Sequence, residues 1–107
     1  MSLFTKKSQF WLPVTIRRPA DYGGVEEFKF DALVRFFKRT ELTKLAGSYL
    51  EQAGALIVDW KGVSEDDGTP VPYTPDALAR LDEEHPNAMA DIVESYSRAW
   101  RGAREKN

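Results

Sequence analysis

The feature that most constrains the fold is an alternation of side chains that starts at Val25. Apolar and charged side chains take turns along this stretch; the apolar series is Phe28, Phe30, Ala32, Val34 and Phe36, and the charged one is Lys29, Asp31 and Arg35. A period of two predicts a β-strand with one buried face. Leu33 and Phe37 interrupt the charged series, so we expect the second face to be partly covered too, by a helix or by another subunit.

A partner strand precedes this alternation. Residues 10–18 are rich in β-forming side chains such as Trp11 and Ile16. Pro13 cannot donate a backbone hydrogen bond, which predicts an edge strand or a bulge. Residues 19–24 contain Pro, Asp and a Gly-Gly pair, the composition of a chain reversal. The two strands therefore predict an antiparallel hairpin.

A helix is expected after the hairpin, with Thr40 as its N-cap and Glu41 as its first residue. Apolar side chains then recur every three or four positions, as on one face of a helix. They are Leu42, Leu45, Ala46, Tyr49, Ala53, Ile57 and Trp60. Gly47 and Gly54 each disfavour a helix interior by about 1 kcal/mol relative to Ala, which predicts a bend or break near Gly54. A short buried strand over residues 55–60 is the alternative.

Residues 59–78 combine an aromatic anchor, an acidic turn and a helix start. Trp60 closes the apolar stripe and is expected in the core. Asp67 and Gly68 are typical turn residues, within an expected exposed loop over residues 62–73. These local features are structural rather than catalytic.

Two helices are expected in the remaining chain. Thr74 caps the first, Pro75 occupies its first position, and Pro86 ends it at about Glu84. The second runs from residue 86 or 87 to about Ala103. Its apolar face comprises Met89, Ile92, Val93, Tyr96 and Trp100.

These elements predict one α+β domain over residues 1–107, in which an N-terminal antiparallel β-hairpin or small sheet is followed by about three α-helices. Residues 1–9 are a candidate for a disordered terminus. With 107 residues, 42% of them hydrophobic, the chain has the size of one domain with one core. No run approaches the roughly 18 apolar residues of a membrane span, and residues 1–7 lack the apolar stretch of a signal peptide. We therefore expect a cytoplasmic protein.

The residue types favour neither catalysis nor metal binding. The chain has no cysteine and one histidine, which excludes disulfides, thiolate ligands and a cysteine nucleophile. The acids before Gly68 fail the register of a calcium loop, because Thr74 stands where the bidentate Glu belongs. Residues 82–85 point in different directions on a helix, and His85 is expected to be an ordinary exposed histidine. We expect no catalytic residue, no cofactor, no metal site and no enzymatic activity.

A basic and aromatic N-terminal region suggests a different function. Its residues have the composition that binders of single-stranded nucleic acid use. They are Lys6, Lys7, Phe10, Trp11, Arg17 and Arg18. However, residues 1–50 carry nine Lys/Arg against five Asp/Glu, whereas residues 51–107 carry six against twelve. The acidic second half opposes a phosphate backbone, so nucleic-acid binding is a minor alternative.

The aromatic content favours an interaction protein over an enzyme. Six Phe, four Tyr and three Trp are more than a small core needs. Large aromatic side chains left at a surface are typical anchors of protein interfaces.

Three segments carry a resemblance to a known family. Residues 28–42 combine an aromatic-rich strand, a basic patch and a helix opening with Glu-Leu. Residues 60–81 combine Trp-x-Gly-Val, an acidic turn with Gly, Pro-x-Pro-aromatic, Thr-Pro and a Leu series, and residues 88–107 form a closing helix with a Tyr and a Lys-Asn tail. In these respects the chain resembles the phage tail assembly chaperone family of long-tailed siphophages and related prophages. The junction over residues 37–42 is shorter than in that family. The family pattern therefore does not fix the register of the first helix.

The resemblance implies a non-enzymatic virion-assembly factor in the host cytoplasm. Such a factor binds the long, hydrophobic tape measure protein, keeps it soluble and helps recruit the tail tube protein, with no nucleic-acid or membrane partner. Masking a helical client needs apolar grooves with polar rims, often multiplied by self-association, so a homo-oligomer is expected. The expected client-binding residues are Trp11, Phe37, Tyr73 and Trp100. The alternatives are a small structural tail component and, less favoured, a nucleic-acid-binding phage protein.

Overall fold

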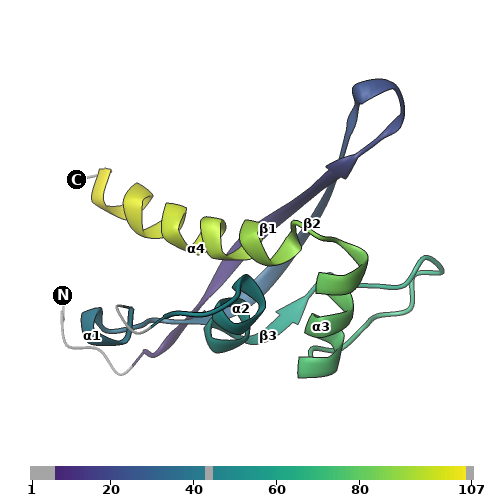
Figure 1. Ribbon diagram of the computed structural model, residues 1–107. Helices are drawn as coiled ribbons and strands as arrows, with labels where there is room; N and C mark the ends of the chain where they lie inside the picture. The colour runs from purple at the N-terminus through teal and green to yellow at the C-terminus, as the bar shows by residue number, and fades with distance from the viewer. Residues whose placement is uncertain (1–6, 43–44, 106–107) are drawn as a thin grey trace.

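A three-stranded antiparallel sheet carries the helices on one of its faces (Figure 1). The computed structural model describes residues 7–42 and 45–105. The elements are β1 (Gln9–Pro19), the 3-10 turn η1 (Asp21–Gly23), β2 (Val25–Arg35), α1 (Arg39–Leu42), α2 (Tyr49–Leu56), β3 (Ile57–Lys61), α3 (Pro75–Glu84) and α4 (Ala88–Glu105). The strand order is β1-β2-β3. The predicted α+β class, with a small N-terminal sheet followed by helices, is confirmed.

The hairpin forms where the alternation predicted it. Gln9 pairs with Arg35 at its base and Pro19 pairs with Val25 at its tip. The turn places Tyr22 in the left-handed region at φ 59° and ψ 36°. The distal part of this hairpin projects beyond the helices (Figure 1), and its side chains are exposed. Gln9, expected within a disordered terminus, instead begins β1, and residues 1–6 of that prediction lie outside the described residues.

β1 is an edge strand, as Pro13 predicted. Pro13 lies opposite Asp31 of β2 and its side chain is exposed. Further along the strand, the backbone N–H of Arg17 donates a 3.3 Å hydrogen bond to the Oδ2 atom of Asp91 on α4. Along this edge, Pro13 therefore has no backbone N–H donor, and the N–H donor of Arg17 is already hydrogen-bonded.

The two faces of the sheet differ as the alternation predicted. Phe30, Ala32 and Val34 are buried under the helices. On the second face, Leu33 is partly buried between its strand neighbours Trp11 and Asp59, and no described helix packs on this face. Phe37 was expected on that second face as well, but β2 ends at Arg35 and Phe37 packs against the core.

The long helix expected from Glu41 does not form. Gly47 adopts φ +94°, and Ser48 opens a new helix through a capping box, in which its Oγ atom accepts from the N–H of Glu51 while the Glu51 side chain accepts from the N–H of Ser48. The break thus lies at Gly47 rather than at Gly54, which is inside α2. Thr40 lies within the short α1 instead of capping a helix at Glu41.

The alternative prediction of a strand over residues 55–60 is confirmed from Ile57 onward, whereas residues 55 and 56 are the end of α2. Ile57 pairs with Val34 and Asp59 pairs with Leu33, so Val58 is an extra residue in the ladder. Because of this bulge, Ile57 and Trp60 face the core together although they are three positions apart. The same spacing made the sequence resemble one helical stripe, and the stripe's Leu42 and Tyr49 are exposed.

The loop and the helix start after β3 are as predicted. The Oδ1 atom of Asp67 accepts from the N–H of Thr69 at 2.9 Å, and Gly68 is left-handed at φ +89°. The Oγ1 atom of Thr74 accepts from the N–H of Ala77 at 2.9 Å and caps α3.

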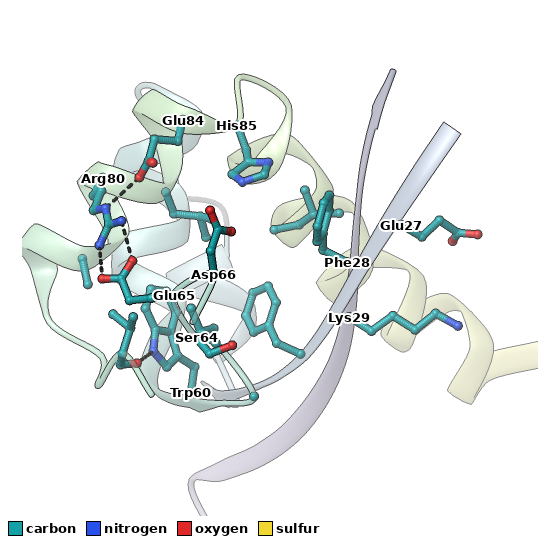
Figure 2. Close-up of a pocket in the computed structure, with 17 residues that line it drawn as sticks. Glu27, Phe28, Lys29, Trp60, Ser64, Glu65, Asp66, Arg80, Glu84 and His85 are labelled. Carbon is teal, nitrogen blue, oxygen red and sulfur yellow. Dashed lines mark hydrogen bonds and ion pairs between the residues drawn. The ribbon is translucent and has the colours of Figure 1, made fainter. Parts of the chain in front are cut away.

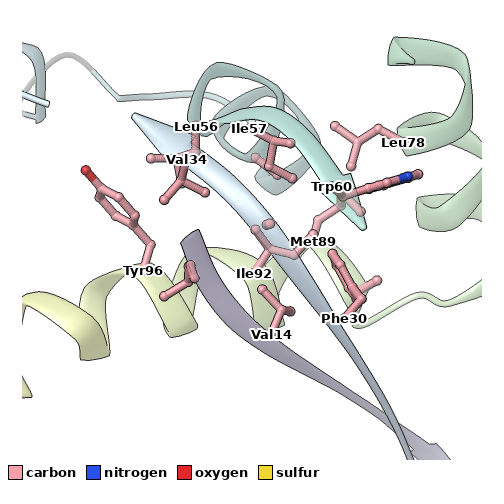
Figure 3. Packing of buried hydrophobic residues seen from close by; sticks show 14 of the residues in the cluster. Val14, Phe30, Val34, Leu56, Ile57, Trp60, Leu78, Met89, Ile92 and Tyr96 are labelled. Carbon is pink, nitrogen blue, oxygen red and sulfur yellow. The ribbon is translucent and has the colours of Figure 1, made fainter. Parts of the chain in front are cut away.

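The core is one hydrophobic cluster between the sheet and the helices (Figure 3). Its buried residues are Leu12, Val14, Ile16, Phe30, Ala32, Val34, Ala53, Leu56, Ile57, Trp60, Leu78, Ala88, Met89, Ile92 and Tyr96. The predicted core position of Trp60 is therefore confirmed. The apolar face of α4 is buried or partly buried as far along the helix as Tyr96. Trp100 is 42% exposed, because β2 stops at Arg35 and leaves this end of the helix without a strand beneath it.

Candidate functional site

Four aromatic rings gather where β1 begins, β2 ends and α4 approaches its C-terminus. We call this cluster the aromatic end; it comprises Phe10, Phe36, Tyr96 and Trp100. The ring centroids are 4.5 Å apart for Phe10 and Phe36, 5.9 Å for Phe10 and Tyr96, 6.0 Å for Phe36 and Trp100, and 6.4 Å for Tyr96 and Trp100. Tyr96 and Trp100 are one helical turn apart, so both point to the same side of α4.

Tyr96 fixes this cluster to the sheet. Its ring is buried, and its hydroxyl donates to the carbonyl oxygen of Arg35 at 2.8 Å and accepts from the N–H of Phe37 at 3.3 Å. The hydroxyl group of Tyr96 is thereby satisfied inside the protein. Phe36 and Trp100 remain 39% and 42% exposed. The aromatic end thus offers rigid apolar contact area and is suited to binding rather than to bond-making chemistry.

The four residues expected to bind a partner do not form one surface. Trp100 belongs to the aromatic end, whereas Trp11 lies on the helix-free face of the sheet, 45% exposed, with the Nζ atom of Lys61 at 4.4 Å from its ring centroid. Phe37 and Tyr73 are partly buried against the core. Burial raises the pKa of the Tyr73 phenol.

Sequence reasoning missed two exposed rings. Phe28 and Phe36 stand at the two ends of the alternating series and were assigned to its buried face, yet both are exposed. Alternation identifies the face of a strand on which a side chain lies, but not how far along the strand the helices extend. The signal in the sequence that could have indicated their exposure is the position of Phe28 and Phe36 at the two ends of the series.

A pocket of about 460 Å³ lies between β2, the loop over residues 62–66, α3 and His85 (Figure 2). We call it the Trp60 pocket. Phe28, Phe30 and Trp60 supply its aromatic wall. The Nε1–H group of Trp60 donates to the carbonyl oxygen of Val71 at 2.8 Å, which fixes the ring.

Ion pairs hold one side of the Trp60 pocket. Arg80 lies 2.6 Å from the Oε1 atom of Glu65 and 2.7 Å from the Oε2 atom of Glu84 (Figure 2). The hydrogen bonds from Arg80 lower the pKa of Glu65. The same contacts, first with Glu65 and then with Glu84, raise the pKa of Arg80. The loop is thereby tied to α3.

His85 does not have the exposed position that the sequence suggested. It is partly buried because its ring packs against Phe28, with 5.5 Å between the centroids. Its Nδ1 atom is buried and has no hydrogen-bond partner among the described residues. On Phe28, the guanidinium carbon of Arg18 lies 4.9 Å from the ring centroid.

The basic N-terminal region is largely neutralised where the structure describes it. Arg17 lies 3.5 Å from Glu27, and Arg18 lies 2.9 Å from Glu26. Lys6 of that prediction lies outside the described residues. In the part of the chain that the structure describes, no group of three or more His, Asp or Glu side chains could hold a metal ion, and no helix is long and apolar enough to cross a bilayer.

Comparison with known proteins identifies the chain through its helical part. The family model described as YdaY prophage protein matches residues 43–106, which include α2, β3, α3 and α4, and the hairpin lies outside the match. No curated protein and no solved structure gives a match. The match agrees with the prophage side of the resemblance to tail assembly chaperones and does not extend to tail assembly itself. This chain belongs to the YdaY prophage protein family.

Proposed function

We propose that this prophage protein is a non-enzymatic chaperone of tail assembly. It binds the tape measure protein in the host cytoplasm, keeps that client soluble and helps to recruit the tail tube protein. The proposal rests on the resemblance of residues 25–107 to tail assembly chaperones and on the prophage family of the chain. Self-association of the chaperone would multiply its binding surfaces along a long client.

The aromatic end is the observation that carries the proposal. Phe36 and Trp100 are exposed on a support that Tyr96 holds through two hydrogen bonds. Rigid aromatic side chains contribute strongly to binding, because little side-chain freedom is lost when a partner covers them. An apolar stripe on a helical client is the natural complement of such a surface.

The structure also refines the choice of client-binding residues. Phe36 joins Trp100 as a principal candidate, and Trp11 remains a candidate on the other face of the sheet. Phe37 and Tyr73 are weaker candidates, because both pack against the core and their substitution would change stability together with binding.

Co-expression with the tape measure protein of the same prophage tests this function. We expect the double substitution Phe36→Ala and Trp100→Ala to reduce the soluble fraction of the client severely. Tyr22→Ala is the matched control, since Tyr22 is a fully exposed aromatic side chain at the distant hairpin tip. Circular dichroism verifies that each variant is folded. Equal client solubility with the double variant and with the unmodified chaperone would refute the role of the aromatic end.

Mass spectrometry of purified particles separates the chaperone from a small structural tail component. A chaperone leaves before the particle is complete, so we expect this chain to be absent from finished particles. Its presence there in a fixed ratio to the tail tube protein would instead identify it as a structural component.

A further inference from the structure

One face of the sheet carries no helix among the described residues (Figure 1). We call it the open face; its central residues are Trp11, Pro13, Thr15, Lys29, Asp31 and Lys61. The sequence predicted that a helix or another subunit would cover this face, because Leu33 interrupts its charged series. Since no described helix does so, the cover has to come from outside the described chain.

Two opposite charges at the centre of the open face have no partner within the described chain. The side chains of Lys29 and Asp31 make no ion pair or hydrogen bond with any described residue. Lys61 stands directly across the ladder from Asp31, yet its Nζ atom lies over the Trp11 ring, 4.4 Å from the centroid. Asp31 is partly buried, where a carboxylate without a partner is costly. The face therefore presents an unpaired cation and an unpaired anion two positions apart on one strand.

We infer that a second copy of this chain packs on the open face. A cation and an anion side by side are their own complement when the second copy is turned end for end about a two-fold axis. If that axis crosses the strands midway between Lys29 and Asp31, each Asp31 faces the Lys29 of the other copy, and the dimer contains this ion pair twice. A partner with charges of one sign would instead meet a like charge at one of the two positions. The inference deepens the proposed function, because it rests on the self-association proposed there.

The strand register brings Trp11 into the same contact. On β1 the axis lies between Pro13 and Thr15, so Trp11 and Arg17 are equally distant from it. The indole of each copy then lies over the guanidinium of the other, an arrangement in which a ring face attracts a cation. Arg17 keeps its ion pair with Glu27, because a guanidinium stacks through its face and pairs through its edge. Trp11, a candidate for client binding above, thus belongs to the contact between copies.

The shape and size of the open face define how strong this contact can be. The compact side chains of Pro13 and Thr15 leave a hollow of about 500 Å³ beside Lys29 and Asp31, which has room for the long Lys29 side chain of the second copy. Strands about 4.8 Å apart and roughly 30 Å long give a contact of roughly 400 Å² on each copy of a three-stranded sheet. Because stable interfaces are larger, we expect a weak dimer with a dissociation constant on the order of 100 µM.

Sedimentation equilibrium of the chain alone, at concentrations up to about 1 mM, tests the contact. We expect a reversible equilibrium between monomer and dimer. Asp31→Lys leaves two cations at the centre of the face and Lys29→Glu leaves two anions, so each variant alone should dimerise at least about tenfold more weakly. A mixture of the two variants should form a heterodimer about as strong as the unmodified dimer, because every cation then faces an anion. An unmodified protein that stays monomeric, or a mixture that does not associate, would overturn the inference.

Two further variants locate the contact on the open face. Glu83→Lys makes the same charge change as Asp31→Lys at an exposed position of α3 and should leave the dimer unchanged. Trp11→Ala should weaken dimerisation about tenfold, as for an aromatic anchor of an interface. Circular dichroism verifies that each variant is folded. Equal weakening by Glu83→Lys and Asp31→Lys would show that only the overall charge matters, and a Trp11→Ala dimer of unmodified strength would contradict the proposed axis.

The outcome is independent of the test of client binding. Sedimentation uses the chain without the client, and the open face and the aromatic end share no residue. If the charge variants dimerised like the unmodified protein while Phe36→Ala and Trp100→Ala reduced client solubility, only the contact between copies would be refuted. If heterodimer formation succeeded and client solubility did not change, the contact would hold and the role of the aromatic end would be wrong.

Discussion

Two tryptophans of this protein have similar neighbours and opposite exposure. Trp60 meets Phe30 and Tyr73 edge-on, with 5.8 and 5.1 Å between ring centroids. Trp100 meets Phe36 and Tyr96 edge-on, at 6.0 and 6.4 Å. Nevertheless Trp60 is 5% exposed and Trp100 is 42% exposed. Ring contacts alone therefore do not determine whether an aromatic side chain belongs to the core.

The difference lies in the layers around each ring and in the indole N–H group. Trp60 lies on the core side of β3. Its N–H group donates to the carbonyl oxygen of Val71 in the loop over residues 62–73. Trp100 is on the last part of α4, past the end of β2, and its N–H group has no partner among the described residues. A satisfied and buried indole stabilises the fold, whereas an exposed indole with a free donor is available to a partner.

The largest effect is expected for Trp60→Ala. Removing a buried indole leaves a cavity and should lower the free energy of unfolding by about 3 to 5 kcal/mol. Urea denaturation followed by circular dichroism measures this change. A loss below that of Trp100→Ala, measured in the same way, would contradict the distinction between the two tryptophans.

Tyr96→Phe sharpens the comparison at the aromatic end. The substitution keeps the ring and removes the hydroxyl that joins Arg35 and Phe37. We expect the free energy of unfolding to fall by about 1.5 kcal/mol, because two backbone groups lose their partner. Tyr22→Phe is the control, since its side chain is fully exposed, and it should be neutral. Similar values for both variants would show that the hydroxyl of Tyr96 does not support the cluster.

Trp100→Ala should have a smaller effect on stability. The ring keeps a large exposed area, so we expect a loss of no more than about 1 kcal/mol in urea denaturation. The substitution should nevertheless reduce client solubility, as proposed for the aromatic end. If it destabilised the protein as much as Trp60→Ala, the ring would be part of the core and its exposure would have no bearing on binding.

The smallest effect concerns the ion pair beside Trp60. Arg80 lowers the pKa of Glu65, so the stabilisation from this pair is present above the ordinary pKa of a glutamate and is lost as the pH falls through the lowered pKa. In an NMR titration of the carboxylates, Arg80→Met should raise the pKa of Glu65 towards its ordinary value. Glu94 is the internal control, because its pKa is lowered by Arg101 and should not change. An unchanged Glu65 would show that Arg80 is not the cause.

The sequence predicted the elements whose cause is local. The alternation from Val25, the turn at Asp67 and the cap at Thr74 each depend on neighbouring residues, and the structure has all three. The spacing of Ile57 and Trp60 led to the wrong prediction of a helix that continues to Trp60. A bulge in a strand brings residues three positions apart to one face, which is also the spacing of a helical face.

The candidate sites were harder to predict, because distant segments build them. The Trp60 pocket joins Phe28 of β2 to Asp66 in a loop and His85 after α3, and no local pattern connects them. Likewise, the exposure of Phe36 depends on where the helices end above the sheet. Trp100 was identified from sequence as a candidate, but the sequence could not place Phe36 beside it.

The protected edge of β1 affects how this protein behaves at high concentration. An open edge strand is a template on which further chains can add, and repeated addition leads to fibres. In β1, Pro13 supplies no donor, and Asp91 occupies the donor of Arg17. A newly arriving strand would meet an interrupted row of donors, which disfavours growth of the sheet at the β1 edge. Abundant synthesis in a host cell is therefore expected to leave the protein dispersed rather than fibrous.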